Sequence, residues 1–391
     1  MKLLYLMYRF PYPLDKGDKL RAFHFIKHLS KYHEIDLLSI IDEKIDDESR
    51  DILKMYVNNI FEIKFSKLKL VKNLLLNLFN GKPFQNAFVY DKSIKKQVER
   101  IIKSEKYDYA ICLMIRPADY LKGIKIRKML DYQDALSIGF ERRSKKNKLF
   151  GRFFYQKEAN RLRNYEVEIF DEFEDKIIIT EEDRKYINRD DREKIVVVPN
   201  GIDLDFFMPL KNFERKFDLL FVGNMQYEPN VLCVKYIVNE ILPIIQKAKP
   251  DTTIMIAGAD PKNEVLALKR KNVIITGRLD DIREAYSQGK VFLAPMQTGT
   301  GLQNKLLEAM AMRLPVVTSE LCNKAIQAKD NVEILIGRNP EEYAQHCINL
   351  LNNSTFSNTI SENAYNFVKT NYSWEKNVRI LNSIIDNSAK N

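Results

Sequence analysis

The sequence predicts an α/β protein made of two Rossmann-like parallel-sheet domains that face a cleft. Short apolar runs alternate with longer mixed segments along all 391 residues, which is typical of strands and helices in alternation. A chain of this length suits two or three domains. The segment PNGID at 199–203 joins two series of this kind, so we place the domains at residues 1–200 and 201–374. A ligand is expected beyond the carboxyl ends of the strands.

The apolar runs define seven candidate strands before residue 200 and six after it. They cover residues 3–7, 35–40, 60–65, 109–114, 127–130, 176–180 and 195–198, and then 217–222, 252–257, 273–275, 291–294, 315–318 and 332–335. Helical patterns fill most of the intervals, for example at 19–32 and 92–104. Because parallel strands need crossover connections, this alternation favours helices on both faces of each sheet.

Composition excludes several protein classes. Hydrophobic residues make up 45% and charged residues 30% of the chain, as in ordinary globular proteins. No window approaches the roughly 18–20 uninterrupted apolar residues of a membrane span. The four cysteines are widely spaced, with no CxxC pair. These features predict a reduced cytoplasmic protein without a zinc site.

Positive charge is concentrated in the first half. Residues 51–170 carry 26 Lys and Arg against 13 Asp and Glu, whereas residues 201–391 carry 22 against 21. Such a region suits nucleic acid, an anionic membrane or an acidic substrate. Nucleic acid is not favoured, because no RNP-like strand, zinc finger or helix-turn-helix signature is present.

Two stretches combine basic residues with apolar ones. Residues 67–83 read KLKLVKNLLLNLFNGKP, and residues 142–155 read RRSKKNKLFGRFFY. Basic side chains beside exposed aromatic ones suit the anionic inner face of a cell membrane. Core-packing helices with a solvated basic rim would give the same pattern, so both interpretations stay open.

The most informative stretch is residues 298–312, TGTGLQNKLLEAMAM. It follows a buried apolar strand, and its two glycines allow a sharp turn and the close approach of a ligand. A helix is expected to begin near Gln303, and a helix N-terminus attracts anions. Lys305 adds a positive charge and Glu308 lies one turn further on, so a diphosphate near Gly301 and a diol near Glu308 would fit. An ion pair between Lys305 and Glu308 within the helix is the structural alternative.

A long loop follows the first predicted strand. Residues 9–21 read RFPYPLDKGDKLR, which is longer than the usual 2–6 residues of such loops. Gly17 could approach a phosphate or sugar, and Arg21 could face the cleft. Asp18 could bind a ligand or cap the next helix. A plain surface loop remains the alternative.

Two carboxylates, Asp131 and Asp134, follow the strand predicted at 127–130. Acids that face a cleft would lie at this end of a strand, although either Asp could instead cap the next helix. His24 and His28 are four residues apart on the first helix. No third ligand is evident, so we predict no metal site.

The second half offers further ligand candidates at strand ends. Gly223 follows its first strand, and the backbone around Arg278 and Leu279 is a candidate contact for a nucleobase. A plain turn from strand to helix would look the same.

Together these motifs resemble the retaining GT-B glycosyltransferases of family 4, the glycosyl transferases group 1. The resemblance is to the branch that serves bacterial exopolysaccharide and glycan assembly. The matching segments are RFPYPLDKGDKLR at 9–21, DYQDALS at 131–137, VVVPNGID at 196–203, FVGNMQYEPN at 221–230, ITGR at 275–278, GLQNKLLEAMAMRLPVVT at 301–318 and YSW at 372–374.

This resemblance implies a GT-B fold and a transferase. The second domain would bind a nucleotide-diphospho-sugar and the first a glycan or polyprenyl-linked acceptor, while the closing helix at about 375–391 would pack back on the first domain. Glu308 would hold the ribose hydroxyls. Backbone groups of Gly301 and its neighbours Thr300, Leu302 and Asn304 would contact the diphosphate and sugar. Asn224 would be a further donor contact. Family members need no metal or other cofactor.

Three positions depart from the family pattern. Thr300 replaces a second glutamate, Asn224 lies where basic residues are usual, and Asp131 or Asp134 replaces an N-terminal histidine. Lys305 therefore becomes the leading candidate for stabilising the departing diphosphate, with Asp134 as a second catalytic candidate and Asp18, Arg21 and Asp131 as acceptor contacts. A GT-B sugar-nucleotide epimerase or hydrolase and a non-catalytic assembly scaffold are the alternatives.

Overall fold

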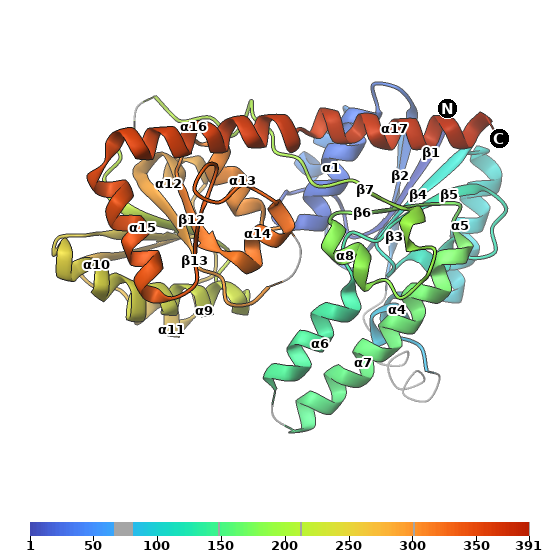
Figure 1. Cartoon of the computed structure of the whole chain (residues 1–391). Coiled ribbons are helices and arrows are strands. Elements are labelled where there is room, and N and C mark those ends of the chain that lie inside the picture. The colour runs from blue at the N-terminus through green and yellow to red at the C-terminus, as the bar shows by residue number, and fades with distance from the viewer. Residues whose placement is uncertain (66–80, 148, 212, 300–301, 391) are drawn as a thin grey trace. The chain divides into compact units, whose positions relative to one another are not determined.

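The computed structural model describes residues 1–65, 81–147, 149–211, 213–299 and 302–390. It divides the chain into two compact units. The first unit is Met1–Pro199 together with Trp374–Asn391, and the second is Asn200–Ser373. Each unit contains one parallel sheet with helices on its faces (Figure 1).

The first unit has a seven-stranded sheet with the order β3-β2-β1-β4-β5-β6-β7. Its strands are β1 (Lys2–Tyr8), β2 (Glu34–Ile41), β3 (Asn59–Lys64), β4 (Tyr109–Leu113), β5 (Arg127–Asp131), β6 (Asp175–Ile178) and β7 (Ile195–Val197). Leu6 on β1, which lies between β2 and β4, aligns with Leu38 of β2 and with Cys112 of β4. Because β1 is an inner strand of the sheet, the loop after it lies at the carboxyl ends of inner strands and not beside an outermost strand.

Strand β1 is apolar along its length because it is buried on both faces. Leu4 and Leu6 belong to one core cluster, while Leu3, Tyr5 and Met7 belong to another on the opposite face. Full burial of each such side chain contributes roughly 1.5–3 kcal/mol. The two-sided burial explains why this run shows no alternation of polar and apolar residues.

Helices cover both faces of the first sheet. They are α1 (Gly17–Leu29), α2 (Asp47–Lys54), α4 (Phe84–Val89), α5 (Lys92–Glu105), α6 (Leu136–Lys146), α7 (Leu149–Glu168), α8 (Glu181–Tyr186) and α17 (Trp374–Lys390), with short 3-10 turns η1 (Ala118–Tyr120), η2 (Ile169–Glu172) and η3 (Arg192–Lys194). Helices α6 and α7 form a hairpin that projects from this unit, and α17 runs beside α1 (Figure 1).

Helix α17 joins the first unit through an aromatic contact. The Trp374 ring stacks on the His24 ring of α1 at 4.6 Å between centroids, and it meets Phe25 edge-on at 5.9 Å. Val378, Leu381 and Ile385 continue the buried stripe. His24 and His28 therefore lie against α17 rather than on a free helix face, and their rings stack at 6.3 Å.

The second unit has a six-stranded sheet with the order β10-β9-β8-β11-β12-β13. Its strands are β8 (Phe217–Val222), β9 (Ile254–Ala257), β10 (Val273–Gly277), β11 (Gly289–Ala294), β12 (Val316–Ser319) and β13 (Leu335–Gly337). Its helices are α9 (Glu228–Tyr236), η4 (Ile237–Ile241, a π-helix), α10 (Leu242–Ala248), α11 (Asn263–Leu266), α12 (Arg283–Gln288), α13 (Asn304–Ala311), α14 (Glu320–Ile326), α15 (Pro340–Asn352) and α16 (Ser354–Asn371). One apolar cluster fills this unit.

All thirteen predicted strands are present, with one clear shift. The strand predicted at 332–335 lies at Leu335–Gly337, because a turn with Asn331 in the left-handed region (φ 59°) precedes it. Helix α1 begins at Gly17, two residues before the predicted start, and its N-cap is Lys16. Asp18 therefore lies in the first turn and does not cap the helix.

The basic stretch at 67–83 falls mostly outside the described residues, which omit 66–80. Residues 142–155 lie in α6, α7 and the connection between them. Within the described part of the chain, no helix combines the length and apolarity that a membrane crossing requires.

Candidate functional site

The loop between β11 and α13 carries the central motif, and α13 presents Lys305 and Glu308. The helix begins at Asn304, one residue after the predicted start. Lys305 lies in its first turn, and the Glu308 carboxylate lies one turn further along. Thr300 and Gly301, which we predicted as donor contacts, lie outside the described residues.

Lys305 is held by residues from neighbouring elements. Its Nζ donates to Asn230 Oδ1 of α9 at 2.5 Å, and it lies 5.1 Å from the centre of the Phe221 ring. Burial lowers the pKa of Lys305, since removal from water disfavours the ammonium form. Among the described neighbours, no carboxylate forms an ion pair with this ammonium group, so its charge is available to an anionic ligand.

Glu308 has a separate partner. The Tyr286 hydroxyl of α12 donates to Glu308 Oε2 at 2.7 Å. Burial raises the pKa of Glu308, and the Tyr286 hydrogen bond opposes that rise. Lys305 and Glu308, both described, form no ion pair with each other. The alternative of an intrahelical ion pair is therefore wrong, because each side chain is bound to a different neighbouring element.

Gly223 and Asn224 form a turn against the same asparagine. Asn230 Nδ2 donates to the Asn224 carbonyl oxygen at 2.8 Å. A Cβ atom at position 223 would lie 2.7 Å from Asn230 Nδ2, so only glycine fits without displacing this side chain. Asn230 thus fixes both the turn after β8 and the Lys305 ammonium group. Its role was missed from the sequence, where Asn230 is the third residue of α9.

Glycines also shape the ends of β9 and β10. Gly258 has φ 144°, and a Cβ there would lie 1.9 Å from the Gly223 carbonyl oxygen. Gly277, with φ 73°, accepts from Gly258 N–H at 3.0 Å. The end of β9 thus approaches the turn at Gly223 closely, and Arg278 and Leu279 follow the neighbouring end of β10.

Three predicted donor contacts of this unit have structural partners. Leu302 and Leu279 are partly buried against the core. The Asn304 side chain accepts from Asn200 Nδ2 at 3.5 Å. None of these three side chains carries a charge that could bind a diphosphate, whereas Lys305 does.

Arg21 and Asp131 bind each other in the first unit. Arg21 Nε donates to Asp131 Oδ2 at 2.5 Å, and both side chains are fully buried. The Arg21 guanidinium lies 4.4 Å from the centre of the Phe25 ring. An acceptor has no surface of either side chain to contact. The prediction that they bind the acceptor is therefore corrected: the pair links α1 to β5 inside the core.

Asp18 and Gly17 lie at the edge of the first sheet. Arg9 Nη1 donates to Asp18 Oδ2 at 2.6 Å. A Cβ at Gly17 would lie 3.7 Å from the Gln133 side-chain nitrogen, so the loop after β1 contacts the segment after β5. Asp18 is buried, and it stabilises the turned backbone at Arg9 (φ 88°).

Asp134 lies beyond the end of β5 in a group of charged residues. Burial raises its pKa to about 7, and the carboxylates of Asp183, Glu166 and Asp18 add to the rise while Arg116 opposes it. Ala135 is the N-cap of α6, so neither Asp131 nor Asp134 caps that helix. A carboxyl that titrates near neutral pH suits proton transfer.

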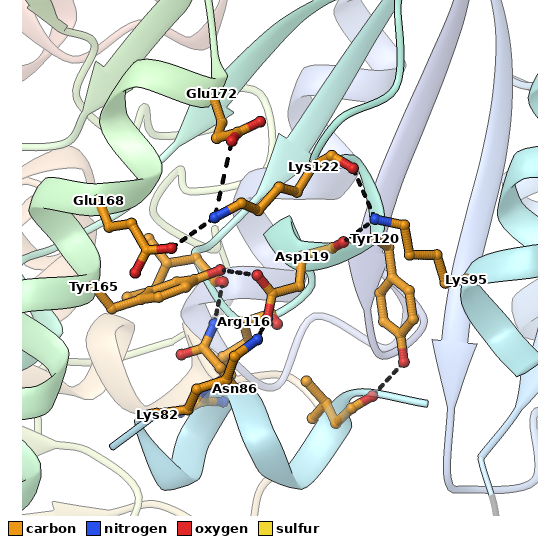
Figure 2. A network of polar contacts seen from close by, with 12 residues as sticks. Lys82, Asn86, Lys95, Arg116, Asp119, Tyr120, Lys122, Tyr165, Glu168 and Glu172 are labelled. Atoms are coloured by element: carbon orange, nitrogen blue, oxygen red, sulfur yellow. Dashed lines mark hydrogen bonds and ion pairs between the residues drawn. The ribbon is translucent and has the colours of Figure 1, made fainter. Parts of the chain in front are cut away.

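Figure 2 shows what holds the segment that carries Arg116. Asn86 Nδ2 donates to the Ile115 carbonyl oxygen at 2.7 Å. The Lys95 ammonium donates to the Asp119 carbonyl oxygen at 3.2 Å, and the Tyr165 hydroxyl donates to Asp119 Oδ1 at 2.9 Å. The segment after β4 is thus fixed to α4, α5 and α7.

Metal ligands are not grouped in the described part of the chain. No set of three or more His, Cys, Asp or Glu side chains there has the geometry to hold a metal ion.

Comparison with known proteins identifies the second unit. Residues 216–353 match the family model for glycosyl transferases group 1. The match lies within the second unit, Asn200–Ser373. An uncharacterized 44.6 kDa protein in the cps region of Klebsiella pneumoniae is 24% identical to this chain, over 94% of it and 95% of the relative.

Solved structures of glycosyltransferases are similar to this chain over its whole length and show that it has the GT-B fold. A glycosyltransferase from Rickettsia africae is similar with a TM-score of 0.71 and 16% identity, and the alignment covers 100% of this chain and 99% of the other. HepE of Anabaena, solved in complex with UDP-glucose, is similar with a TM-score of 0.66 and 12% identity, over 99% and 100% of the two chains. The predicted fold class is confirmed.

Proposed function

We propose that this protein is a glycosyltransferase that moves a sugar from a nucleotide-diphospho-sugar to a glycan or lipid-linked acceptor, with retention, in bacterial surface polysaccharide biosynthesis. The observation that carries the proposal is the pair of separately held groups on α13, the Lys305 ammonium and the Glu308 carboxylate. A diphosphate needs positive charge, and ribose hydroxyls need a hydrogen-bond acceptor. The relatives support the donor and the pathway: HepE is solved with UDP-glucose, and the Klebsiella relative lies in a cps region.

In this proposal the second unit binds the donor. Glu308 accepts hydrogen bonds from the ribose hydroxyls, and the backbone at Arg278 and Leu279 contacts the nucleobase. Lys305 binds the diphosphate and stabilises the charge that develops as the bond to the sugar breaks. Since Lys305 supplies that charge, we expect EDTA to leave the rate unchanged.

The first unit binds the acceptor in this proposal. Asp134 is the second catalytic residue, because its carboxyl titrates near neutral pH. Gly17 approaches the donor phosphates, and Asp18 supports the loop through Arg9. Transfer then depends on holding donor and acceptor in register, with no covalent intermediate on the protein.

Kinetics of two substitutions on α13 test the donor site. Lys305→Ala should lower kcat by about 100-fold or more, because charge on the leaving group would be unopposed. Glu308→Gln should weaken UDP binding by about tenfold or more and change kcat less. Lys290→Ala is the matched control, since Lys290 is exposed at the start of β11 and pairs with Asp218. Unchanged turnover in Lys305→Ala would refute the proposed role.

A thermal-shift screen of nucleoside diphosphates and their sugars identifies the donor. A ligand present at 100 times its Kd stabilises the protein by about 2.7 kcal/mol. A chain that gains stability from no nucleotide would exclude the proposed transferase. Sugar-nucleotide turnover that is the same with and without acceptor would instead indicate a hydrolase or epimerase.

We also propose that the α6–α7 hairpin binds the anionic inner face of the cell membrane. Phe153 is 72% and Phe154 48% exposed, and Arg143, Lys145 and Arg152 lie nearby in the sequence. Vesicles with anionic lipid should bind the protein more tightly than neutral ones. Phe153→Ser should weaken that binding, whereas Phe213→Ser, in the other unit, should not. Binding that is independent of anionic lipid would contradict the proposal.

A further inference from the structure

Three buried polar atoms at the edge of the first sheet have no hydrogen-bond partner among the described residues. They are Arg116 Nε, Gln133 Oε1 and Asp134 Oδ1. Buried polar atoms are normally satisfied, and leaving one without a partner costs about 1–3 kcal/mol. One donor and two acceptors without protein partners can therefore bind a ligand that both donates and accepts hydrogen bonds.

These atoms belong to the segments that follow two adjacent strands. Leu113 at the end of β4 aligns with Asp131 at the end of β5. Arg116 comes shortly after the first of these positions, and Gln133 and Asp134 come shortly after the second. The charges of Arg116 and Asp134 act on each other, and the charge of Asp18 acts on both. Arg116 and Asp134 are thus close enough for their charges to interact, and the Gln133 side chain, next to Asp134 in the chain, lies beside Gly17 at the start of α1.

The backbone at this edge is held in an unfavourable conformation. Arg9, Met114 and Gln133 have φ values of 88°, 68° and 67°, in the left-handed region that non-glycine residues avoid. They follow or end β1, β4 and β5, three neighbouring strands. Each such residue costs roughly 1–3 kcal/mol, and such strain concentrates at functional sites. Hydrogen bonds from Met114 N–H to the Asp131 carbonyl, at 2.7 Å, and from Ile179 N–H to the Gln133 carbonyl, at 3.0 Å, maintain the turns.

The chemistry of the three atoms matches an alcohol. A hydroxyl group donates one hydrogen bond and accepts two, so one hydroxyl can accept from Arg116 Nε and donate to Asp134 Oδ1, and a second hydroxyl of the same polyol can donate to Gln133 Oε1. A phosphate or carboxylate could accept from Arg116 but would meet the two oxygen acceptors without a hydrogen to give them. The group therefore favours a neutral polyol over an anion.

We propose that Arg116, Gln133 and Asp134 bind neighbouring hydroxyl groups of the acceptor sugar, and that Asp134 removes the proton of the reacting hydroxyl during transfer. This inference rests on the proposed glycosyltransferase reaction. The hydroxyl oxygen forms a bond to the anomeric carbon of the donor sugar, and the bond from that carbon to the diphosphate oxygen breaks. The electron pair leaves on the diphosphate, and the proton goes to the Asp134 carboxylate. Arg116 and Gln133 are positioning residues.

The pH profile follows from the charged groups around Asp134. Asp18 of α1, Arg116 after β4, Glu166 of α7 and Asp183 of α8 all act on its carboxyl. Its pKa of about 7 means that the carboxylate, which is the form that accepts a proton, predominates only above neutral pH. The acceptor kcat/KM should rise about tenfold per pH unit below pH 7 and level off above it.

The experiment compares acceptor and donor kinetics with UDP-glucose and a panel of methyl glycosides. Arg116→Lys and Gln133→Leu should lower the acceptor kcat/KM by about 10–100-fold, with the Kd of UDP unchanged. Asp134→Asn should lower kcat for transfer by about 100-fold and abolish the rise of the profile with pH. Arg127→Lys is the matched control. Arg127 Nη1 is also buried without a hydrogen-bond partner among the described residues, but Arg127 begins β5 at the opposite edge.

Several results would contradict the proposal that these residues bind the acceptor. They are unchanged acceptor kinetics in Arg116→Lys, an equal loss in Arg127→Lys, or a loss of UDP affinity that accompanies the loss of acceptor kinetics. A protein that binds UDP but neither binds nor glycosylates any methyl glycoside at about 50 mM, the range of a weak sugar site, also overturns it and leaves the donor function standing. A protein that binds no nucleotide would instead refute the proposed function.

Discussion

Replacing Asp134 with Asn should make the stability of the first unit less dependent on pH. The pKa of this carboxyl rises from 3.8 to about 7 in the native protein, mainly through burial. Between these values the native protein holds a proton that the unfolded chain has released. The free energy of unfolding therefore falls as pH rises through this window. Asn cannot ionise, so the variant lacks this loss.

The magnitude follows from the two pKa values. One unit corresponds to 1.36 kcal/mol, and integration between pH 5 and pH 8 gives a loss of about 3 kcal/mol in the wild-type protein. For a domain of this size, 1 kcal/mol shifts the melting temperature by roughly 2–4 °C. From pH 5 to pH 8, the melting temperature of the wild-type protein should thus fall by about 6–12 °C more than that of the Asn variant.

Tryptophan fluorescence during heating measures the difference in melting temperature between the two proteins for the first unit alone. The chain has one tryptophan, and Trp374 is buried in that unit against His24. Asp191→Asn is the control, because Arg189 lowers the pKa of Asp191 and keeps it ionised throughout. A gap between wild type and Asp134→Asn that is the same at both pH values would refute the reasoning.

Three further substitutions test contacts in each unit. Tyr286→Phe removes the donor to Glu308 at 2.7 Å and should weaken UDP binding about tenfold in calorimetry; unchanged affinity would show that the tyrosine does not orient the carboxylate. Gly258→Ala places a Cβ 1.9 Å from a carbonyl oxygen and should destabilise the second unit by about 3 kcal/mol or more, which melting followed by circular dichroism would detect. Arg21→Met leaves Asp131 buried without its partner and should cost about 3–5 kcal/mol; adding Asp131→Leu should recover most of it, and a double variant as unstable as the single one would contradict this.

The strands of both sheets could be predicted well because a strand buried on both faces consists of consecutive apolar residues. Residues 219–222 are apolar and buried on both sides of the sheet, and β8 has the predicted bounds, Phe217–Val222. The position of Lys305 and Glu308 could also be predicted, since both lie in one helix after a glycine turn.

The partners of these side chains could not be predicted, because they come from distant parts of the chain. Lys305 is bound by a residue 75 positions away and Glu308 by one 22 positions away. Arg21 could be placed on a helix face, but its burial depends on Asp131, 110 residues further on. The left-handed conformations of Met114 and Gln133 have no sequence signal, since neither residue type favours them.

The order of segments along the chain has a consequence for biosynthesis. The first unit contains both residues 1–199 and helix α17, and residues 200–373 intervene. At about 5–20 residues per second, roughly 10–35 s pass on the ribosome between the two parts. During that interval the side of α1 that later receives Trp374 and Leu381 has no permanent cover. The first domain to be translated is therefore the last to be completed, and its nascent form has an apolar surface that a chaperone could protect until α17 arrives.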